Sequence, residues 1–274
     1  MTVGKLFDNV SKFLRTHPMS VVLEEDALRP DLAGMRMFDD PIFAIGDAND
    51  PLFKELKSPG VVSEELILPG EWLPVAKSVI SFFLPFTDEV KRSNCDMSSS
   101  ASDEWLHARI EGQMILDIFA DYIKSELEKA GFEAIVPALD PRFKTIEPFT
   151  SNWSERHAAY ICGLGTFGLS KGLITKKGMT GRFGSVITNA ELPVTEREYS
   201  SPFEYCNMCG KCAKNCPVGA IDPSKGVACG KSHEICATIV RQKLPPHGKN
   251  QRIRYGCGKC QVAVPCESCI PKKV

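Results

Sequence analysis

The distribution of cysteine is the feature that most constrains how this chain folds. Ten of its twelve cysteines lie at or after Cys206, and several of them form CxxC pairs. A secreted disulfide framework spreads its cysteines more evenly. Tight CxxC spacing, in a chain that opens without a long apolar signal segment, is typical of metal or cluster ligation. Cys95 and Cys162 stand apart and are predicted to be structural thiols.

The first group of cysteines has a spacing with a specific meaning. Cys206, Cys209, Cys212 and Cys216 form the CxxCxxCxxxCP run of bacterial ferredoxins, which ends in Pro217. Three cysteines at this spacing bind one 4Fe-4S cluster while the fourth reaches a different cluster, so the run predicts a second cluster. A tetrahedral zinc ion favours separated CxxC pairs, which makes zinc the weaker interpretation.

The second group of cysteines departs from the standard pattern. Cys257 and Cys260 form a CxxC pair, but Val264 stands before Pro265, and the next cysteine, Cys266, follows the proline. We predict that one cluster is ligated by Cys206, Cys209, Cys212 and Cys266, and the other by Cys216, Cys236, Cys257 and Cys260. Two alternatives stay open: Cys269 could take the place of Cys266 as a cluster ligand, and Cys229 could take the place of Cys236. Otherwise Cys229 and Cys269 are predicted to be free surface thiols.

Before the cysteines, the chain alternates strand-like and helix-like segments, which is typical of an α/β core. The clearest helix spans about residues 103–130, with Ser102 or Asp103 as its cap and Gly131 just past its end. Its predicted apolar face consists of Leu106, Ile110, Met114, Ile118, Tyr122 and Ile123. The segments predicted as strands are 20–23, 42–45, 79–84, 132–136 and 185–188.

The regular pattern fades near residue 195. We therefore predict an α/β (α+β) domain over residues 1–195, which holds cofactor or substrate. A ferredoxin-like double 4Fe-4S domain is predicted over residues 196–274.

Charge and hydropathy argue against two classes of partner. With 33 basic and 34 acidic residues, the chain has no global field that would attract nucleic acid or anionic membrane. The longest apolar run, residues 79–86, is too short to cross a bilayer, and residues 3–14 have the pattern of an amphipathic helix. We predict a cytoplasmic protein that binds neither nucleic acid nor membrane.

A glycine-rich segment follows the polar, helix-like residues 154–162. Gly163, Gly165 and Gly168 match GxGxxG literally, but a dinucleotide site requires this motif to follow a buried strand. A helix C-cap and a tight turn explain these glycines without a ligand.

Several segments together resemble a known family. A strand from Lys77-Ser78 to Leu84-Pro85, the Gly-Leu-Gly segment, a strand that begins at Gly184 and the double cluster motif are similar to epoxyqueuosine reductase and to its relatives, the corrinoid-dependent reductive dehalogenases. The resemblance covers roughly residues 70–266 and implies that the α/β domain holds cobalamin above the nearer cluster. The implied corrinoid pocket comprises Gly163, Gly165, Thr166, Phe167 and Gly168. Arg182, between two glycines, is a further candidate contact for an anionic group of cofactor or substrate.

The chain also departs from epoxyqueuosine reductase. That family has an aspartate proton donor shortly before the Gly-Leu-Gly segment, and residues 147–152 contain no aspartate here. The sequence ends soon after its last cysteine, without a C-terminal extension of the kind that would bind tRNA. The chain is therefore interpreted as a divergent branch, for which the tRNA-modifying activity is not predicted.

Together these patterns predict an anaerobic, oxygen-sensitive iron-sulfur oxidoreductase. Two 4Fe-4S clusters would relay single electrons from a donor such as a ferredoxin or flavodoxin to a corrinoid or a small-molecule substrate in the α/β domain. His157 and Tyr160, beside Glu155 and Arg156, are weak candidates for catalysis as proton donors. The alternative is an electron-transfer or activating protein that has no substrate of its own and docks to a redox partner.

Overall fold

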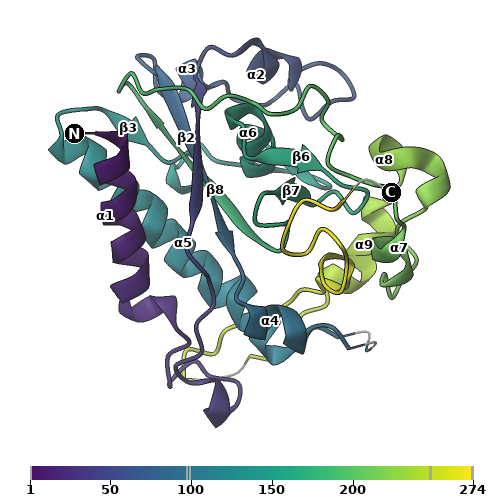
Figure 1. Ribbon diagram of the computed structural model, residues 1–274. Helices are drawn as coiled ribbons and strands as arrows, with labels where there is room; N and C mark the ends of the chain where they lie inside the picture. Colours follow the sequence, from purple (N-terminus) through teal and green to yellow (C-terminus); the bar gives the residue numbers. More distant parts are fainter. Residues whose placement is uncertain (1, 97, 99, 247–248, 273–274) are drawn as a thin grey trace.

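A four-stranded antiparallel sheet forms the centre of the computed structural model, which describes residues 2–96, 98, 100–246 and 249–272 (Figure 1). Its strands lie in the order β1-β2-β8-β3 and span Ile42–Asp47, Ser78–Pro85, Gly181–Thr188 and Ala134–Ile135. The apolar strand β2 is buried along its whole length between β1 and β8. The predicted mixed fold with a cysteine-rich C-terminal part is confirmed, and the antiparallel pairing makes it α+β.

Two helical layers cover the sheet. On one face, α1 (Val3–Thr16) and α5 (Asp103–Lys129) lie side by side and pack on Ile80, Phe82 and Leu84 of β2. On the other face, α6 (Glu155–Cys162) packs with α2 (Pro51–Glu55) and α3 (Pro69–Trp72) on residues of opposite parity such as Val79 and Phe83. The alternation follows from the two-residue period of a strand.

The remaining elements are short and connect this core to the cysteines. The further α-helices are α4 (Asp88–Ser93), α7 (Lys211–Lys214), α8 (Gly226–Cys229) and α9 (His233–Val240). The small strands are β4 (Thr145–Ile146), β5 (Thr150–Ser151), β6 (Gly165–Phe167) and β7 (Leu173–Thr175). Short 3-10 helices span Pro18–Ser20, Pro30–Leu32, Pro137–Leu139, Pro223–Lys225 and Lys259–Gln261.

The long helix is confirmed, and its ends follow the predicted signals. The Ser102 hydroxyl accepts a hydrogen bond from the Trp105 amide, and Gly131 has a left-handed φ of 88°. The predicted apolar face is only partly right. Leu106 and Ile123 are buried, whereas the other four residues are half-buried, because the helix turns His107, Glu111 and Gly112 inward together with an apolar face shifted from the predicted one.

Two predicted strands differ from the structure. The segment 20–23 is not a strand, because Ser20 ends a 3-10 helix and Val21 makes only an isolated bridge to Arg36. The segment 132–136 contributes only the two residues of β3, which meet the end of β8.

A buried ionic cluster ties the C-terminal segment to α5. The Arg254 guanidinium is 1% exposed and donates to the Glu111 carboxylate at 2.7 Å and to the Asp26 carbonyl at 2.8 Å. Arg252 donates to the Asp26 carboxylate at 2.9 Å. We call these four residues the C-terminal anchor. Buried charges require such partners, so the anchor holds the chain just before Cys257 in one place.

Among the described residues, no helix is both long enough and apolar enough to pass through a membrane.

Candidate iron-sulfur site

Four cysteines surround one hollow at the edge of the molecule. Cys206, Cys209, Cys212 and Cys266, which we call the first cysteine set, line it together with residues 168–170. Burial, reinforced by neighbouring thiols, raises the pKa of Cys212 and of Cys266 to about 12. Cys269 does not line this hollow in the described residues, and it is exposed.

The conformation and close packing of the backbone position the cysteines of the first set. Gly210, with a φ of 71°, begins α7 in the left-handed region, which glycine adopts without strain. The Met179 amide donates to the Cys266 carbonyl at 3.0 Å, and the two sulfur atoms of these residues are 4.0 Å apart. A Cβ on Gly178 would overlap the Glu267 backbone, so glycine is required for this approach.

The structure also brings together Cys216, Cys236, Cys257 and Cys260, the second cysteine set. Burial, together with the thiols of the other three, raises the pKa of Cys260 to about 11. Burial also raises the pKa of Cys257, and Cys236 and Cys216 contribute in the same direction. Cys229 is exposed, and its electrostatic neighbour is Lys171.

Close packing on α5 positions the second CxxC pair. Gly258 has a φ of 73°, and a Cβ there would overlap the Trp105 indole. The Asn94 side-chain amide donates to the Cys257 carbonyl at 2.9 Å, and the Arg109 guanidinium donates to the Tyr255 carbonyl at 2.8 Å. The position of this pair therefore depends on tertiary packing as well as on local spacing.

The two cysteine sets adjoin: Cys206 and Cys266 of the first set and Cys216 and Cys260 of the second belong to one packed cluster with Cys212. Each set offers four thiols from different segments, which fits the ligand requirement of a 4Fe-4S cluster. Among the described residues, no three His, Cys, Asp or Glu side chains converge closely enough to hold a single metal ion.

One edge of β8 beside the second cysteine set carries polar side chains. The short strand β3 pairs with Ile187 and Thr188 only, so residues 181–186 have no strand on that side among the described residues. From there Arg182 donates to the Gln113 side chain of α5, and Gln113 donates to Asp117 at 2.6 Å. Burial lowers the pKa of Arg182 to about 10 and raises the pKa of Asp117.

A second carboxyl group lies on the other face of β8. The Ser185 hydroxyl donates to Glu155 Oε2 at 2.6 Å and accepts from the Trp153 indole at 3.0 Å. Glu155 Oε1 is buried and has no hydrogen-bond partner among the described residues. Burial raises the pKa of Glu155 to about 8, so this carboxyl is mostly protonated at neutral pH. We call Arg182, Gln113, Asp117, Glu155 and Ser185 the β8-edge group.

Arg156 connects the β8-edge group to the cysteines. It follows Glu155 directly, and its guanidinium donates to the Lys171 carbonyl at 2.6 Å. Its side chain reaches solvent, yet the surrounding protein lowers its pKa by desolvation, and the Cys260 thiol acts in the opposite direction. The guanidinium thus lies within electrostatic reach of the second cysteine set.

The two predicted proton donors have packing roles. The His157 ring lies against Phe167 with centroids 4.8 Å apart, and Tyr160 stacks on Tyr199 at 5.4 Å. Burial, with help from Arg156 and Lys171, lowers the pKa of His157 to about 4, so the ring is neutral at pH 7. A neutral imidazole is a poor proton donor.

Three residues of the segment predicted as a corrinoid pocket pack against the chain's own atoms. Gly163 ends α6 with a φ of 103°, and a Cβ on Gly165 would overlap the Ile174 carbonyl in the β6-β7 hairpin. Thr166 is fully buried and accepts from the Tyr205 amide at 2.8 Å. These three described residues therefore line no cavity that could hold a cofactor.

Phe167 is nearly buried as well, and Gly168 lines the hollow of the first cysteine set. Of the implied cofactor contacts, only Gly168 and Arg182 border a hollow or an unpaired strand edge.

The comparisons with known proteins bear on the cysteines first. A family model described as a 4Fe-4S binding domain matches residues 202–222, which contain the run from Cys206 to Cys216. The chain therefore carries a 4Fe-4S binding region. At the level of sequence, comparison with curated proteins gives no significant match.

Solved structures with a similar fold include epoxyqueuosine reductases. The enzyme from Streptococcus thermophilus has a TM-score of 0.56 and 16% identity over 97% of this chain and 66% of its own. An epoxyqueuosine reductase with an epoxyqueuosine-modified tRNA-Tyr stem loop has a TM-score of 0.50 and 18% identity over 97% of this chain and 66% of its own. The predicted resemblance is confirmed as a shared fold, over about two thirds of those proteins.

A catabolic reductive dehalogenase also matches, with 15% identity over 79% of this chain and 30% of its own. Its TM-score of 0.42 is too low to support an argument.

Sequence reasoning missed Gln113 and Asp117. Both lie on the long helix at half-buried positions, where polar residues are usually read as part of a solvated face. The sequence feature that indicates this pair is its i, i+4 spacing, which places the two side chains together on one side of the helix.

Proposed function

We propose that this protein is a reductase that relays single electrons through two 4Fe-4S clusters to an acceptor at the β8-edge group. The observation that carries the proposal is that members of both cysteine sets pack in one cluster around Cys212, while Arg156, next to Glu155 of the β8-edge group, lies within electrostatic reach of Cys260. Electrons need a continuous route, and clusters bound at these sites would provide one.

The proposed ligands are the four thiols of each cysteine set. Bound 4Fe-4S clusters would accept and pass on one electron at a time. The protein's own residues orient the thiols, bury Cys257 of the second set and place the cationic Arg156 and Lys231 near Cys260. Positive charge near a cluster favours its reduced form, since reduction adds negative charge.

The β8-edge group is suited to a reduction that consumes protons. Arg182 offers a cation to an anionic part of the acceptor, and Glu155 offers a carboxyl that keeps its proton at neutral pH. The acceptor is a small-molecule substrate or a corrinoid. Because Gly163, Gly165 and Thr166 line no cavity that could hold a corrinoid, we assign no step to a corrinoid.

An electron carrier without its own substrate is the second candidate. The exposure of Cys209 in the first cysteine set favours it, since a carrier needs an accessible cluster edge. The buried and unpartnered Glu155 Oε1 favours the reductase, because burying a polar group without a partner is costly unless it has a use.

Electron paramagnetic resonance of anaerobically purified, iron-replete protein tests the proposal. After reduction with dithionite we expect two interacting 4Fe-4S signals, with about eight irons per chain. Addition of cob(II)alamin in a separate sample distinguishes the acceptors, since a shift of cobalt to the base-off form would support a corrinoid. A protein without any cluster signal would contradict both candidates.

A further inference from the structure

Positive charge is concentrated in the part of the chain that carries the cysteine sets. Residues 201–274 contain twelve lysines and arginines but only four acidic residues, whereas residues 1–200 contain 21 basic and 30 acidic residues. The overall net charge of -1 hides this separation. A strongly basic region of this kind attracts anionic partners and speeds their encounter.

Part of this charge is used inside the protein. Arg252 and Arg254 belong to the C-terminal anchor, and Lys259 is buried beside Asp96. By contrast, Lys211 and Lys214 of α7 are exposed, and Lys272 is exposed after Pro271. Among the described residues, none of these three lysines has an ion-pair partner within the chain.

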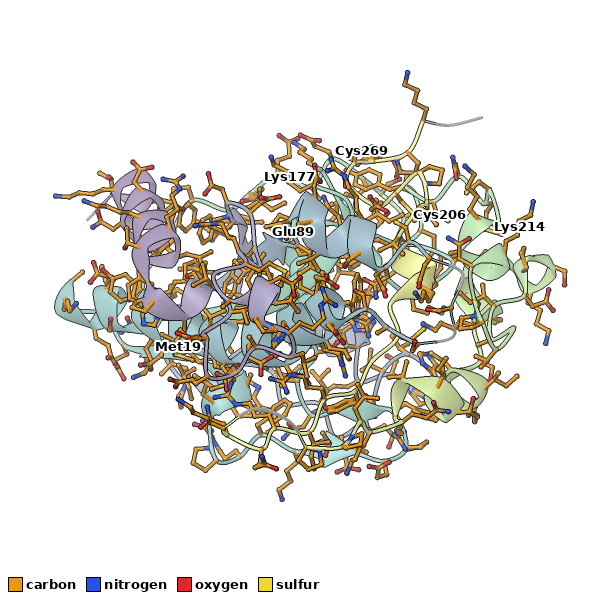
Figure 2. The ribbon with its side chains drawn as sticks, turned by 90° about the horizontal axis from the view of Figure 1, so that it is seen from below. Met19, Glu89, Lys177, Cys206, Lys214 and Cys269 are labelled. Carbon is orange, nitrogen blue, oxygen red and sulfur yellow. The ribbon has the colours of Figure 1, made fainter. Side chains whose placement is uncertain are left out.

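These lysines border the first cysteine set. Lys211 and Lys214 flank Cys212 in sequence, and the Asn207 side chain donates to the Lys272 carbonyl at 2.9 Å. Cys206 and Lys214 lie at the same end of the molecule (Figure 2). The three lysines therefore belong to the two segments, around Cys212 and Pro271, that contribute to the lining of this hollow.

The same region has an exposed apolar residue. Met208 is 38% exposed and lies between Cys206 and Cys209, with its backbone in the left-handed region at a φ of 54°. Cys209 of the first cysteine set is exposed too, whereas no cysteine of the second set is exposed. Electron transfer slows steeply with distance, so an external donor would reach the first set more readily than the second.

We propose that Met208, Lys211, Lys214 and Lys272 form a docking face for an acidic one-electron carrier protein. The inference rests on the proposed function. The reduced carrier gives up one electron to the cluster of the first cysteine set, so the carrier is oxidised and that cluster is reduced. Lysines around an apolar contact would attract and orient the carrier, while Met208 supplies contact area at the centre.

A nucleic acid is the other anionic partner to consider. The arrangement favours a protein, because an exposed cluster ligand and an apolar methionine at the centre of the face suit electron transfer and offer nothing to a phosphate backbone. Phosphate contacts need donors along a track and gain little from a methionine.

The test compares two charge-reversal variants of the cluster-loaded protein. One variant carries Lys211→Glu and Lys214→Glu. The control carries Lys5→Glu and Lys12→Glu, exposed lysines of α1 on the opposite side of the molecule (Figure 1), so that both variants change net charge equally. The probe is a reduced, acidic flavodoxin mixed with each protein by anaerobic stopped flow.

We expect the second-order rate of cluster reduction to fall about tenfold or more in the first variant at low salt, and the difference to shrink as salt screens the charges. The control should react like the unaltered protein. Equal rates in the three proteins, or an equal slowing in both variants, would overturn the docking face. The docking face would also be overturned if the Lys211→Glu, Lys214→Glu variant reacted with flavodoxin at an unchanged rate but no longer bound an RNA stem loop.

Photoreduction with a neutral deazaflavin separates this inference from the proposed function. If all three proteins show the same cluster signals by this route, a slow reaction with flavodoxin reports docking alone. If the unaltered protein shows no cluster signal, the proposed function itself fails.

Discussion

The two cysteine sets differ in how they are built. Three members of the first set, Cys206, Cys209 and Cys212, come from one short run, and the hollow that they line with Cys266 opens at the surface. The second set draws its members from the end of that run, from α9 and from the segment after the C-terminal anchor. The first set therefore depends mainly on local geometry, and the second depends on tertiary packing.

This difference suggests a division of roles. The first set, with its exposed Cys209, suits exchange with a partner, and the second set, within electrostatic reach of Arg156, suits delivery to the β8-edge group. Substitutions that disturb the packing on α5 should therefore cause loss of the second cluster before loss of the first. The predictions below start with the largest expected effect.

Substitution of a proposed ligand should remove one cluster and leave the other. In Cys257→Ser we expect the iron content to fall from about eight to about four per chain, because three thiols remain in the second cysteine set. Iron analysis and electron paramagnetic resonance measure the loss. Cys269→Ser is the matched control, since Cys269 is exposed and should leave both signals intact. Loss of iron in the control would make Cys269 a ligand.

The glycine that packs on α5 should be nearly as sensitive as a ligand. Gly258→Ala forces a methyl group against the Trp105 indole and also strains a left-handed backbone, so we expect loss of the second cluster with the first retained. Gly219→Ala has a similar φ of 62° but no atom near its Cβ, which isolates the backbone strain of about 1 kcal/mol. Equal iron content in both variants would show that the contact with Trp105 is unimportant.

The C-terminal anchor should matter for stability. Arg254→Ala leaves the buried Glu111 carboxylate without its best partner, so we expect the free energy of unfolding to fall by about 3 kcal/mol. Anaerobic urea unfolding of the cluster-loaded protein would show a lower midpoint. Arg29→Ala removes ion pairs of a 43% exposed side chain and should cost less than about 1 kcal/mol. Similar losses in the two variants would argue against the anchor.

The smallest expected effect is a dependence of stability on pH. The pKa of Glu155 is raised to about 8 in the folded chain from an ordinary value of 4.5, so the folded state holds a proton that the unfolded state releases between these values. Stability should therefore fall as pH rises from 4.5 to 8. In Glu155→Gln this fall should be smaller when unfolding midpoints are measured across the range. An identical pH dependence in both proteins would show that Glu155 ionises normally.

Much of the architecture could be predicted from local patterns. The long helix shows its cap, its end and its length in sequence, because Ser102 and Gly131 act on their immediate neighbours. The segment 20–23 misled the prediction, because its branched residues have strand propensity but find no neighbouring strand beyond one bridge. The expectation that the GxGxxG match follows a helix is confirmed, since Gly163 ends α6.

The sequence alone determined that the chain has a 4Fe-4S binding run, since ligand spacing within a few residues is a local property, and that run is matched by the family model. Only the tertiary structure decided which distant groups lie beside it. The grouping of Cys216, Cys236, Cys257 and Cys260, the electrostatic influence of Cys260 on Arg156, and the unpaired edge of β8 all involve residues far apart in the chain. Such contacts follow from how buried surfaces pack, and no local pattern encodes them.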